Sequence, residues 1–434
     1  MPPTRSQTLP SLTNGAPGER PAAPMPRWMR GVLPLLQRLQ HGQLELHLPD
    51  GRVLHCGRTQ AQAEASGGTA PAPAWAPAHA VLRLQDWQVV GDVLRAGDIG
   101  LAEAWIDGRW STPDLPALLK LLLANRDALE RLVYGSWWGS LMHRVRHWLN
   151  RNDRRGSERN IHAHYDLGNA FYRLWLDPTM SYSCAWFDGR QDLPMAQAQQ
   201  AKIARALRAC GLQPGQGSRR VLEIGCGWGA LAEVAARDFD ARVNGVTLSH
   251  EQLAWARERI DRAGLADRVD LRYQDYRDIA DGPYDAIVSI EMIEAVGREW
   301  WPTYFSTLKR LLAPGGRACV QSIVIQDQLF ERYAAGTDFI QQYVFPGGML
   351  PCPAEVRAQA ARAGLTVVDE LCFGRDYAET LRRWRADFLQ RQTDVRALGF
   401  DTRFLRIWDF YLAYCEAAFD AGNTDVVQYT FAHA

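Results

Sequence analysis

The sequence predicts an α/β protein, in which a doubly wound and mostly parallel sheet follows a smaller N-terminal α+β domain. From about residue 196 onward, short apolar stretches alternate with helical stretches of roughly 10 to 15 residues, which is typical of a parallel sheet. A glycine-rich turn follows the first clear strand, as it does in sheets that bind nucleotides. The length of 434 residues favours two domains of unequal size.

The N-terminal part divides into a tail and a small domain. Residues 1–27 are rich in Pro, Ser, Thr, Ala and Gly, which indicates a flexible tail. From residue 28 apolar side chains recur at helical spacing, and residues 42–55 alternate about a turn at Gly51, which predicts a hairpin. The other elements that we expect are a loop over 57–76, a strand over 80–84 and helices over 91–96, 98–110 and 115–123. We assign residues 28–135 to an accessory domain.

A basic and aromatic linker, residues 136–157, joins the two domains. It contains Trp137, Trp138 and Trp148, and six Arg stand against two acidic residues between 136 and 160. One interpretation is a solvated helix that continues into a linker. The other is an interfacial segment, whose Trp rings lie at the lipid headgroups while each Arg contributes ~1 kcal/mol toward an anionic membrane. The sequence leaves both open.

The second domain, residues 158–434, carries the alternating pattern. Its predicted helices span 196–210, 229–239, 251–263 and 300–312, and its predicted strands span 220–224, 241–246, 269–273, 286–290, 318–325, 366–372 and 426–433. The last two strands come after the regular alternation, and for them antiparallel pairing is an option.

Charge and cysteine usage argue against several classes of protein. Lys and Arg total 49 and so do Asp and Glu, so a global basic field for nucleic acid is absent. No run of about 18 apolar residues predicts a membrane-spanning helix, and the N-terminus lacks the apolar stretch of a signal peptide. The eight Cys are scattered without a CxxC pair, which favours reduced thiols in the cytoplasm and disfavours zinc.

The turn after the strand at 220–224 contains Gly225, Gly227 and Gly229. Glycines at this place let the backbone approach a ligand and let the next helix pack on the sheet. Glu223 stands two residues before the first glycine, where a carboxylate can take a polar or cationic group. The spacing differs from G-x-G-x-x-G and no P-loop sequence follows, which disfavours NAD, FAD and a P-loop site.

This turn resembles the first motif, E/D-x-G-x-G-x-G, of Class I S-adenosylmethionine-dependent methyltransferases. Further motifs sharpen the resemblance to the cyclopropane fatty-acid synthase and mycolic-acid methyltransferase family. They lie in order at 160–169, 180–187, 245–252, 291–297, 339–348 and 376–381. The similarity covers about 158 to 434, and the stretch 100–110 (GLAEAWIDGRW) also resembles the N-terminal domain of the bacterial synthases.

The resemblance implies that S-adenosylmethionine binds at the glycine turn. The residues that it assigns to this cofactor are Tyr182, Glu223, Gly225, Gly227, Gly229, Thr247, Leu248, Gln252, Gln274 and Asp275. Some of these positions also have a structural interpretation. Ser249, next to Leu248, predicts the N-cap of the following helix, and Gln274 and Asp275 end a strand.

The resemblance further implies an unsaturated phospholipid acyl chain as substrate, reached by an enzyme peripherally associated with the inner face of the cell membrane. Methyl transfer to the C=C leaves a cation, and a base removes a proton as a cyclopropane ring closes. An apolar chain needs an apolar tunnel. The candidates for its wall, each of which also fits a core position, are Phe171, Tyr172, Tyr343, Phe345 and Met349. The sequence leaves a homodimer open.

The base that the resemblance implies is a bound bicarbonate. Its pocket maps onto Cys184, Glu294, Ile323 and Tyr377, with Gln321 where many members have His. Glu291 and Ala295 stand where Gly and His are often seen. Gln321 can donate a hydrogen bond but cannot carry a positive charge or relay a proton, so we expect bicarbonate to bind more loosely.

The leading expectation is therefore a cyclopropane-fatty-acyl-phospholipid synthase. A C-methyltransferase that gives methyl- or methylene-branched chains without ring closure is the first alternative, because a looser base could remove a proton at a neighbouring carbon. A catalytically weak lipid-binding protein on the same fold is the second alternative. The intact Gly225, Glu294 and Tyr377 argue against it.

Overall fold

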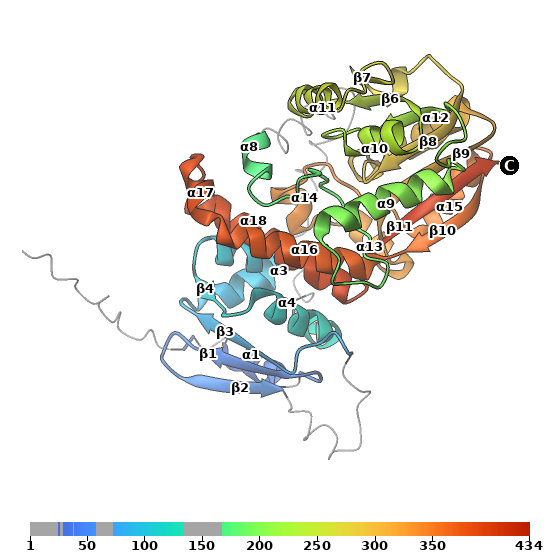
Figure 1. Cartoon of the computed structure of the whole chain (residues 1–434). Coiled ribbons are helices and arrows are strands. Elements are labelled where there is room, and N and C mark those ends of the chain that lie inside the picture. The colour runs from blue at the N-terminus through green and yellow to red at the C-terminus, as the bar shows by residue number, and fades with distance from the viewer. Residues whose placement is uncertain (1–24, 27–28, 38, 58–72, 134–166) are drawn as a thin grey trace, which may run out of the picture.

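A computed structural model describes residues 25–26, 29–37, 39–57, 73–133 and 167–434 of the chain. It contains two β-sheets, and the C-terminal helices α16 (Gly374–Gln390) and α18 (Thr402–Asp420) lie between them (Figure 1). The expected tail, most of the loop at 57–76 and the linker at 136–157 fall outside the described residues. Within those residues, no helix has both the length and the apolar character needed to cross a membrane.

The small N-terminal sheet has the strand order β2-β1-β3-β4. The expected hairpin is present, because β1 pairs antiparallel with β2 around Gly51, whose φ is +85°. The strand expected at 80–84 pairs parallel with β1. The elements of this part are α1 (Met29–Leu36), β1 (Gln43–His47), β2 (Val53–Gly57), β3 (His79–Leu84), α3 (Gln88–Ile106), β4 (Trp110–Ser111), α4 (Leu115–Ala124) and α5 (Arg126–Val133).

The helices expected at 91–96 and 98–110 both belong to α3, and the break expected between them is confirmed. The polar break between them is a kink at Gly97, which has a φ of +60° and a ψ of −130°. The helix ends earlier than expected, at Ile106. The chain turns at Gly108 (φ +74°) and Trp110 enters strand β4, where the register pairs it with Leu84.

The large sheet has the strand order β10-β11-β9-β8-β5-β6-β7. Its strands are β5 (Arg220–Ile224), β6 (Arg242–Thr247), β7 (Val269–Tyr273), β8 (Tyr284–Ile290), β9 (Leu312–Ile325), β10 (Leu365–Cys372) and β11 (Thr424–His433). The first five are parallel, whereas β11 lies antiparallel between β9 and β10. The α/β class and the antiparallel pairing of the two late strands are therefore confirmed. Strand β9 begins six residues before the expected start, at Leu312 rather than 318.

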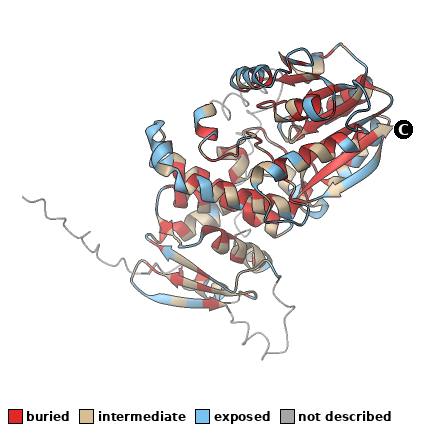
Figure 2. Cartoon of the chain, in the orientation of Figure 1, coloured by how far each residue is buried: buried red, intermediate tan, exposed pale blue. Residues whose placement is uncertain are grey.

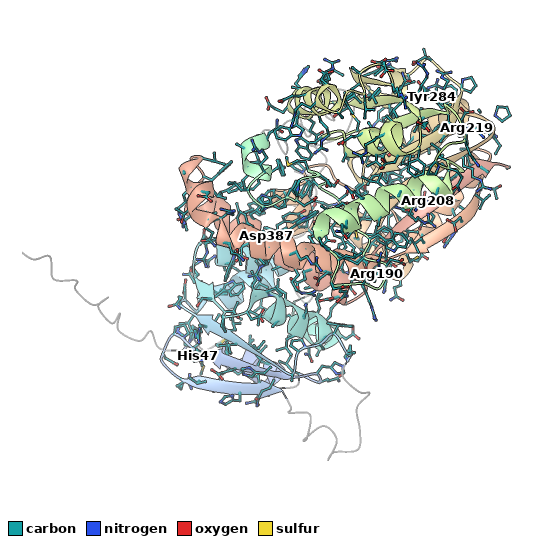
Figure 3. The ribbon with its side chains drawn as sticks, in the orientation of Figure 1. His47, Arg190, Arg208, Arg219, Tyr284 and Asp387 are labelled. Atoms are coloured by element: carbon teal, nitrogen blue, oxygen red, sulfur yellow. The ribbon has the colours of Figure 1, made fainter. Side chains whose placement is uncertain are left out.

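The four helices that the sequence predicts in this part of the chain are present as α9 (Met195–Ala209), α10 (Ala230–Asp238), α11 (His250–Arg262) and α12 (Trp301–Leu311). Further helices accompany them, namely α8 (Asn169–Tyr172), α13 (Asp327–Ala335), α14 (Phe339–Tyr343), α15 (Pro353–Arg362) and α17 (Gln392–Ala397), with 3-10 turns η2 (Tyr276–Asp278), η3 (Ile293–Ala295) and η4 (Arg298–Trp300). Helix α9 packs on the sheet through Ile203 and Leu207, which share a buried cluster with Val221. Its exposed side holds Arg208, whose guanidinium lies 5.9 Å from the ring centre of Phe239 (Figure 3).

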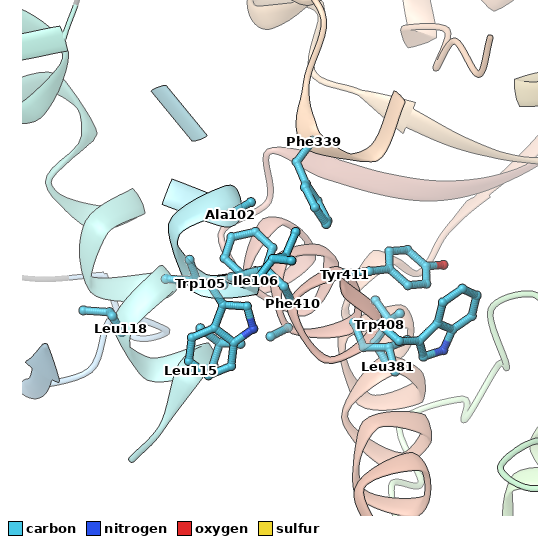
Figure 4. Packing of buried hydrophobic residues seen from close by; sticks show 14 of the residues in the cluster. Ala102, Trp105, Ile106, Leu115, Leu118, Phe339, Leu381, Trp408, Phe410 and Tyr411 are labelled. Atoms are coloured by element: carbon cyan, nitrogen blue, oxygen red, sulfur yellow. The ribbon is translucent and has the colours of Figure 1, made fainter. Parts of the chain in front are cut away.

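One hydrophobic cluster joins the N-terminal part to helices α16 and α18 (Figure 4). Buried residues line the facing sides of these helices as well as the inner strands (Figure 2). At the junction, the indole nitrogen of Trp105 donates to the carbonyl of Arg406 at 3.1 Å, and the Arg406 side chain donates back to the carbonyl of Trp105 at 2.6 Å. Lys120 adds an ion pair to the buried Glu416 at 2.9 Å. The two parts of the chain therefore share one core.

Phe410 tests this shared core because its ring is fully buried and lies 4.9 Å from the ring of Phe339. We expect Phe410→Ala to lower the free energy of unfolding by about 3 to 5 kcal/mol, since the change removes apolar contacts and leaves a cavity. Urea denaturation measures the effect. Leu398→Ala is the control, because Leu398 is 44% exposed and its truncation should have little effect. A loss below ~1 kcal/mol for Phe410→Ala would contradict the shared core.

Candidate active site

A pocket opens at the carboxyl ends of β5, β6 and β8, the edge at which open α/β sheets bind ligands. It is lined by Met180, Ser181, Tyr182, Ser183, Lys202, Ile203, Glu223, Ile224, Gly225, Cys226, Gly227, Trp228, Ala230, Leu231, Val246, Thr247, Leu248, Gln252, Gln274, Tyr276, Ile290, Glu291, Met292 and Ala295. Most residues that the sequence assigns to the cofactor are among them. The exceptions are Gly229 and Asp275.

The three glycines of the turn all have positive φ, but each is needed for a different reason. A β-carbon on Gly225 would lie 3.1 Å from the side chain of Met292, and one on Gly229 would lie 3.0 Å from Ala256. Gly229 therefore permits close packing of α10 on α11. A β-carbon on Gly227 would meet no atom within 4 Å, so this glycine faces open space in the pocket lining. Gly227 is thus the position where an added side chain would compete with a ligand.

Glu223 contributes a buried carboxyl group to the pocket, with only 4% of its surface exposed. Its Oε2 atom has no hydrogen-bond partner among the described residues. Burial raises the pKa of Glu223 well above its ordinary value, and the charge of Lys202 acts in the opposite direction. A buried acceptor without a partner is costly unless a ligand satisfies it. Glu223 therefore fits a ligand that brings a polar or cationic group, such as the ammonium of S-adenosylmethionine.

The other cofactor candidates differ in their surroundings. Ser249 caps α11 as expected, accepting a hydrogen bond from the backbone N–H of Gln252 at 3.2 Å. Gln274 lines the pocket and donates to the carbonyl of Asp278 at 3.0 Å. Asp275 instead caps the turn η2 and accepts from Nε of Arg277 at 2.9 Å. Its carboxylate is already satisfied within the protein, which gives it a structural role in this arrangement.

A second centre forms around the carboxylate of Glu291, at the end of β8. Oε1 accepts from the backbone N–H of Cys184 at 2.9 Å and from Nε2 of Gln321 at 2.7 Å, and Oε2 accepts from the hydroxyl of Tyr377 at 2.9 Å. Burial raises the pKa of Glu291, whereas the charge of Lys202 and these three hydrogen bonds lower it. The backbone of Glu291 is left-handed, with a φ of +49°. The sequence analysis named Glu291 only as a departure from the family pattern, so it is the residue that sequence reasoning missed.

The orientation of the Gln321 amide is fixed by a chain of hydrogen bonds. Arg205 donates to Oε1 of Gln428 at 3.1 Å, and Nε2 of Gln428 donates to Oε1 of Gln321 at 3.0 Å. This leaves Nε2 of Gln321 to face Glu291. The β9–β11 register places Gln321 directly opposite Gln428. An amide in this setting donates to a carboxylate without carrying charge.

Glu294 and Ile323, the remaining candidates for the bicarbonate pocket, lie together beside this centre. The carboxylate of Glu294 accepts from the backbone N–H of Ile323 at 2.5 Å and from the hydroxyl of Ser322 at 3.0 Å. Burial and the nearby charge of Glu291 raise the pKa of Glu294 to about 8. Glu291, and not Glu294, is the carboxyl group that contacts Cys184, Gln321 and Tyr377.

Cys184 contacts Glu291 through its backbone N–H and not through its thiol. Its thiol is fully buried and donates to the carbonyl of Ala185 at 3.2 Å. Burial and the charge of Glu291 raise the thiol pKa well above its usual value. The thiolate, which is the reactive form, is therefore disfavoured.

The residues expected to line an acyl tunnel separate into three groups. Phe171 and Tyr172 are fully buried in an aromatic cluster with Trp175 and Trp408. Phe345 lies 6.5 Å from the ring of Tyr182, whose hydroxyl is 2.8 Å from that of Tyr411. The hydroxyl of Tyr343 donates to Glu103 at 2.6 Å, and Met349 belongs to a different core cluster. Two of these residues have ring contacts with the pocket lining: Phe345 with Tyr182, and Tyr172 with Tyr182 at 5.4 Å and with Trp228 at 5.1 Å.

Known proteins resemble this chain over the whole of the site. A family model described as mycolic acid cyclopropane synthetase matches residues 152–429. The tuberculostearic acid methyltransferase of Mycobacterium tuberculosis is 41% identical over 344 residues, which cover 77% of this chain and 79% of that protein. The cyclopropane-fatty-acyl-phospholipid synthase of Escherichia coli is 35% identical over 365 residues, covering 82% of this chain and 88% of that protein.

Solved structures of the same family have a similar fold. The crystal structure of a mycolic acid cyclopropane synthase complexed with SAH and CTAB matches with a TM-score of 0.58 at 34% identity. The match covers 63% of this chain and 97% of that chain. A cyclopropane synthase from Mycobacterium tuberculosis has the same TM-score and coverage at 32% identity.

The open space at Gly227 leads to a prediction about cofactor binding. Gly227→Val should abolish binding of S-adenosylmethionine, because the side chain would fill pocket space and because the left-handed backbone disfavours a branched residue. Isothermal titration calorimetry measures the affinity, and circular dichroism checks the fold. Gly264→Val is a matched control, since Gly264 also has a positive φ (+68°) and open space but is not part of the pocket lining. Undiminished affinity in a folded Gly227→Val protein would remove this cofactor assignment.

Proposed function

The chain belongs to the mycolic acid cyclopropane synthetase family, and we propose that it methylates a C=C bond in the acyl chain of an unsaturated phospholipid. Its similarity to these relatives and solved structures shows that it is an S-adenosylmethionine-dependent methyltransferase. The observation that carries the finer proposal is the Glu291 carboxylate, held by three donors beside the cofactor pocket. It supports a general base supplied by the chain itself.

The cofactor supplies an electrophilic methyl group, whose carbon bonds to one alkene carbon as its bond to sulfur breaks. The positive charge then lies on the acyl chain, and a proton must leave to restore neutrality. In our proposal Glu291 accepts that proton, so the net change is the gain of one CH₂. A raised pKa suits this task, because a carboxylate that is too acidic accepts a proton poorly.

Aromatic rings beside Glu291 can lower the energy of the cation. Tyr377 contacts the base directly and lies 6.1 Å from the ring of Trp384. Trp384 in turn lies 5.4 Å from Tyr182, a residue of the cofactor pocket. The faces of such rings attract a cation without forming a bond to it. This set of rings therefore supports an acyl chain that passes between the cofactor and Glu291.

Glu291 takes the role that the resemblance assigns to bicarbonate. The donors expected around bicarbonate include Cys184, Gln321 and Tyr377, and all three already donate to Glu291. A second anion beside this carboxylate would suffer like-charge repulsion in a shielded site. We therefore propose turnover that does not depend on bicarbonate.

The product that we propose is a methylene-branched acyl chain formed without ring closure. Its formation requires that a hydride shifts from the methylated carbon to the neighbouring cationic carbon, after which the new methyl group loses a proton to Glu291 and the C=CH₂ bond forms. Two observations favour it: the donors that the resemblance assigns to bicarbonate already contact Glu291, and the relative at 41% identity is named a tuberculostearic acid methyltransferase. Ring closure, the leading expectation from the sequence, is the second candidate. The 35% identity to a cyclopropane-fatty-acyl-phospholipid synthase over 82% of the chain favours it.

Lipid analysis of cells that produce the protein distinguishes the two products. Both add one CH₂, so mass alone does not separate them. Mild hydrogenation reduces a branched alkene and leaves a cyclopropane ring intact. We expect the new lipid to take up hydrogen, and turnover of the purified enzyme to be unchanged by added bicarbonate. A product that resists hydrogenation, together with stimulation by bicarbonate, would establish ring closure instead.

Replacement of the base tests the mechanism. Glu291→Gln keeps the size and most hydrogen bonds of the side chain but cannot accept a proton, so kcat should fall by about 10²- to 10⁴-fold. The affinity for S-adenosylmethionine should change little. Glu294→Gln is the control, because its amide oxygen can still accept from Ile323, and we expect it to retain most activity. Full activity of Glu291→Gln, or equal loss in both variants, would exclude Glu291 as the base.

We also propose that the enzyme meets its lipid at an anionic membrane surface. The basic and aromatic linker at 136–157 supports this by its composition, although it lies outside the described residues. Vesicle sedimentation should show more binding to anionic than to neutral bilayers, and the binding should weaken as salt rises, because such attraction is screened over ~8 Å at physiological ionic strength. Vesicle binding that changes with neither the lipid charge nor the salt concentration would contradict this proposal.

A further inference from the structure

We propose that Lys202 is a positioning residue of this enzyme, whose buried charge keeps Glu291 ionised and thereby ready to accept a proton. The inference rests on the proposed function, because it assumes that Glu291 is the base. It assigns Lys202 a role that is distinct from cofactor binding, although its side chain lines the cofactor pocket.

The position of Lys202 is unusual for a lysine. It lies on α9 with 1% of its surface exposed, on the same helix face as the buried Ile203 and Ala206. Among the residues that the structure describes, no other Lys or Arg is buried to this degree. Burial of an ammonium group is costly unless negative charge compensates it. The sequence gives no signal for this, because a lysine in a helix ordinarily faces solvent.

Two contacts fix Lys202 in place. Its Nζ atom donates to the hydroxyl of Ser183 at 2.6 Å, one residue before Cys184, whose N–H donates to Glu291. Its backbone carbonyl accepts from Nε2 of Gln428 at 3.3 Å, and the same atom donates to Gln321. Ser183 and Gln428, which contact Lys202, are therefore adjacent or hydrogen-bonded to the residues that donate to Glu291.

The charges around the two groups are complementary. The titratable groups that act on Lys202 are Glu291, Cys184, Asp177 and Glu223, of which Glu291 is the strongest favourable influence. The titratable groups that act on Glu291 are Lys202, Cys184, Tyr377 and Glu294. Burial lowers the pKa of Lys202 and raises that of Glu291, and each charge opposes the shift of the other.

Lys202 is the positive partner in this set. Cys184, Gln321 and Tyr377 donate to Glu291 as neutral groups. Glu294, whose pKa is raised to about 8, adds no positive charge in either of its protonation states. Loss of the Lys202 charge would therefore leave a shielded carboxylate with hydrogen bonds but no opposite charge, and protonation of Glu291 would become easier.

Lys202→Met tests this inference, because it removes the charge and keeps the length of an apolar stem. Removal of a positive charge raises the pKa of Glu291, so the base is protonated at a pH where it is ionised in the unmodified protein. The acidic limb of the kcat–pH profile should therefore move to higher pH, with about a tenfold loss at pH 7 that recovers as pH rises. Lys202→Gln, which can keep the contact with Ser183, should move the limb in the same way.

Two controls separate charge from packing. Ser183→Ala removes the hydrogen bond but keeps the ammonium, and should leave the limb nearly in place. Lys309→Met makes the same substitution on α12, where Nζ donates to the carbonyl of Gly364 and the side chain is not part of the pocket lining. It should leave both kcat and the profile unchanged.

A direct readout uses the protein without cofactor. Difference infrared spectra, with Glu291→Gln as the reference, report the protonated carboxyl band of Glu291 as a function of pH. This band should appear at higher pH in Lys202→Met. Calorimetry with S-adenosylmethionine should show affinity within about threefold of the unmodified protein.

The outcomes distinguish this inference from the proposed function. An unmoved pH profile and infrared band, with S-adenosylmethionine affinity lost, would make Lys202 a cofactor ligand and overturn the inference. Full activity of Glu291→Gln would overturn the proposed function first. Inactive Glu291→Gln with an unshifted Lys202→Met would overturn only the role of Lys202.

Discussion

The constraint on which the site depends is the placement of a carboxylate, Glu291, in the wall of the cofactor pocket, where it is only partly exposed to water. A shielded carboxylate without donors would be several kcal/mol less stable than a solvated one, so three donors must reach it together. They come from the loop before α9, from β9 and from α16. The left-handed backbone of Glu291, which costs on the order of 1 to 3 kcal/mol, is held by the hydrogen bond from its N–H to the carbonyl of Gln321 at 2.8 Å.

The cofactor pocket and the carboxylate are built from the same stretch of chain. Met292 follows Glu291 and packs against Gly225. The turn that carries the base therefore leaves no room for a side chain at Gly225 in the glycine turn. Glu223 and Glu291 line one pocket and share Lys202 as a positive neighbour. The cofactor brings further positive charge into this acidic pocket. The cofactor pocket and the base are therefore linked through shape, because one turn of the chain contributes to both.

The sequence predicts most of the fold and the cofactor side of the site. The strands of the large sheet were predictable because buried parallel strands are apolar along their whole length, and the glycine turn was predictable because its spacing is distinctive. Glu291 was not, because motif matching leads to Glu294, three residues later, and no propensity reports a left-handed residue at a strand end. Lys202 was hidden for a different reason, since only the folded chain shows that its helix face is buried. The packing of α18 on the N-terminal part depends on long-range contacts that local patterns do not contain.

Strand β11 has a consequence for synthesis. It is the last strand of the large sheet, yet it lies inside that sheet between β9 and β10, and its Gln428 orients Gln321. On a ribosome, β9 leaves the exit tunnel about a hundred residues before β11 does. During that interval the edge of β9 is unpaired, and an open edge of this kind can pair with other chains. Nascent chains should therefore depend on protection at this stage, and a chain that stops before residue 424 would lack both the strand that joins β9 to β10 and the polar network that it completes.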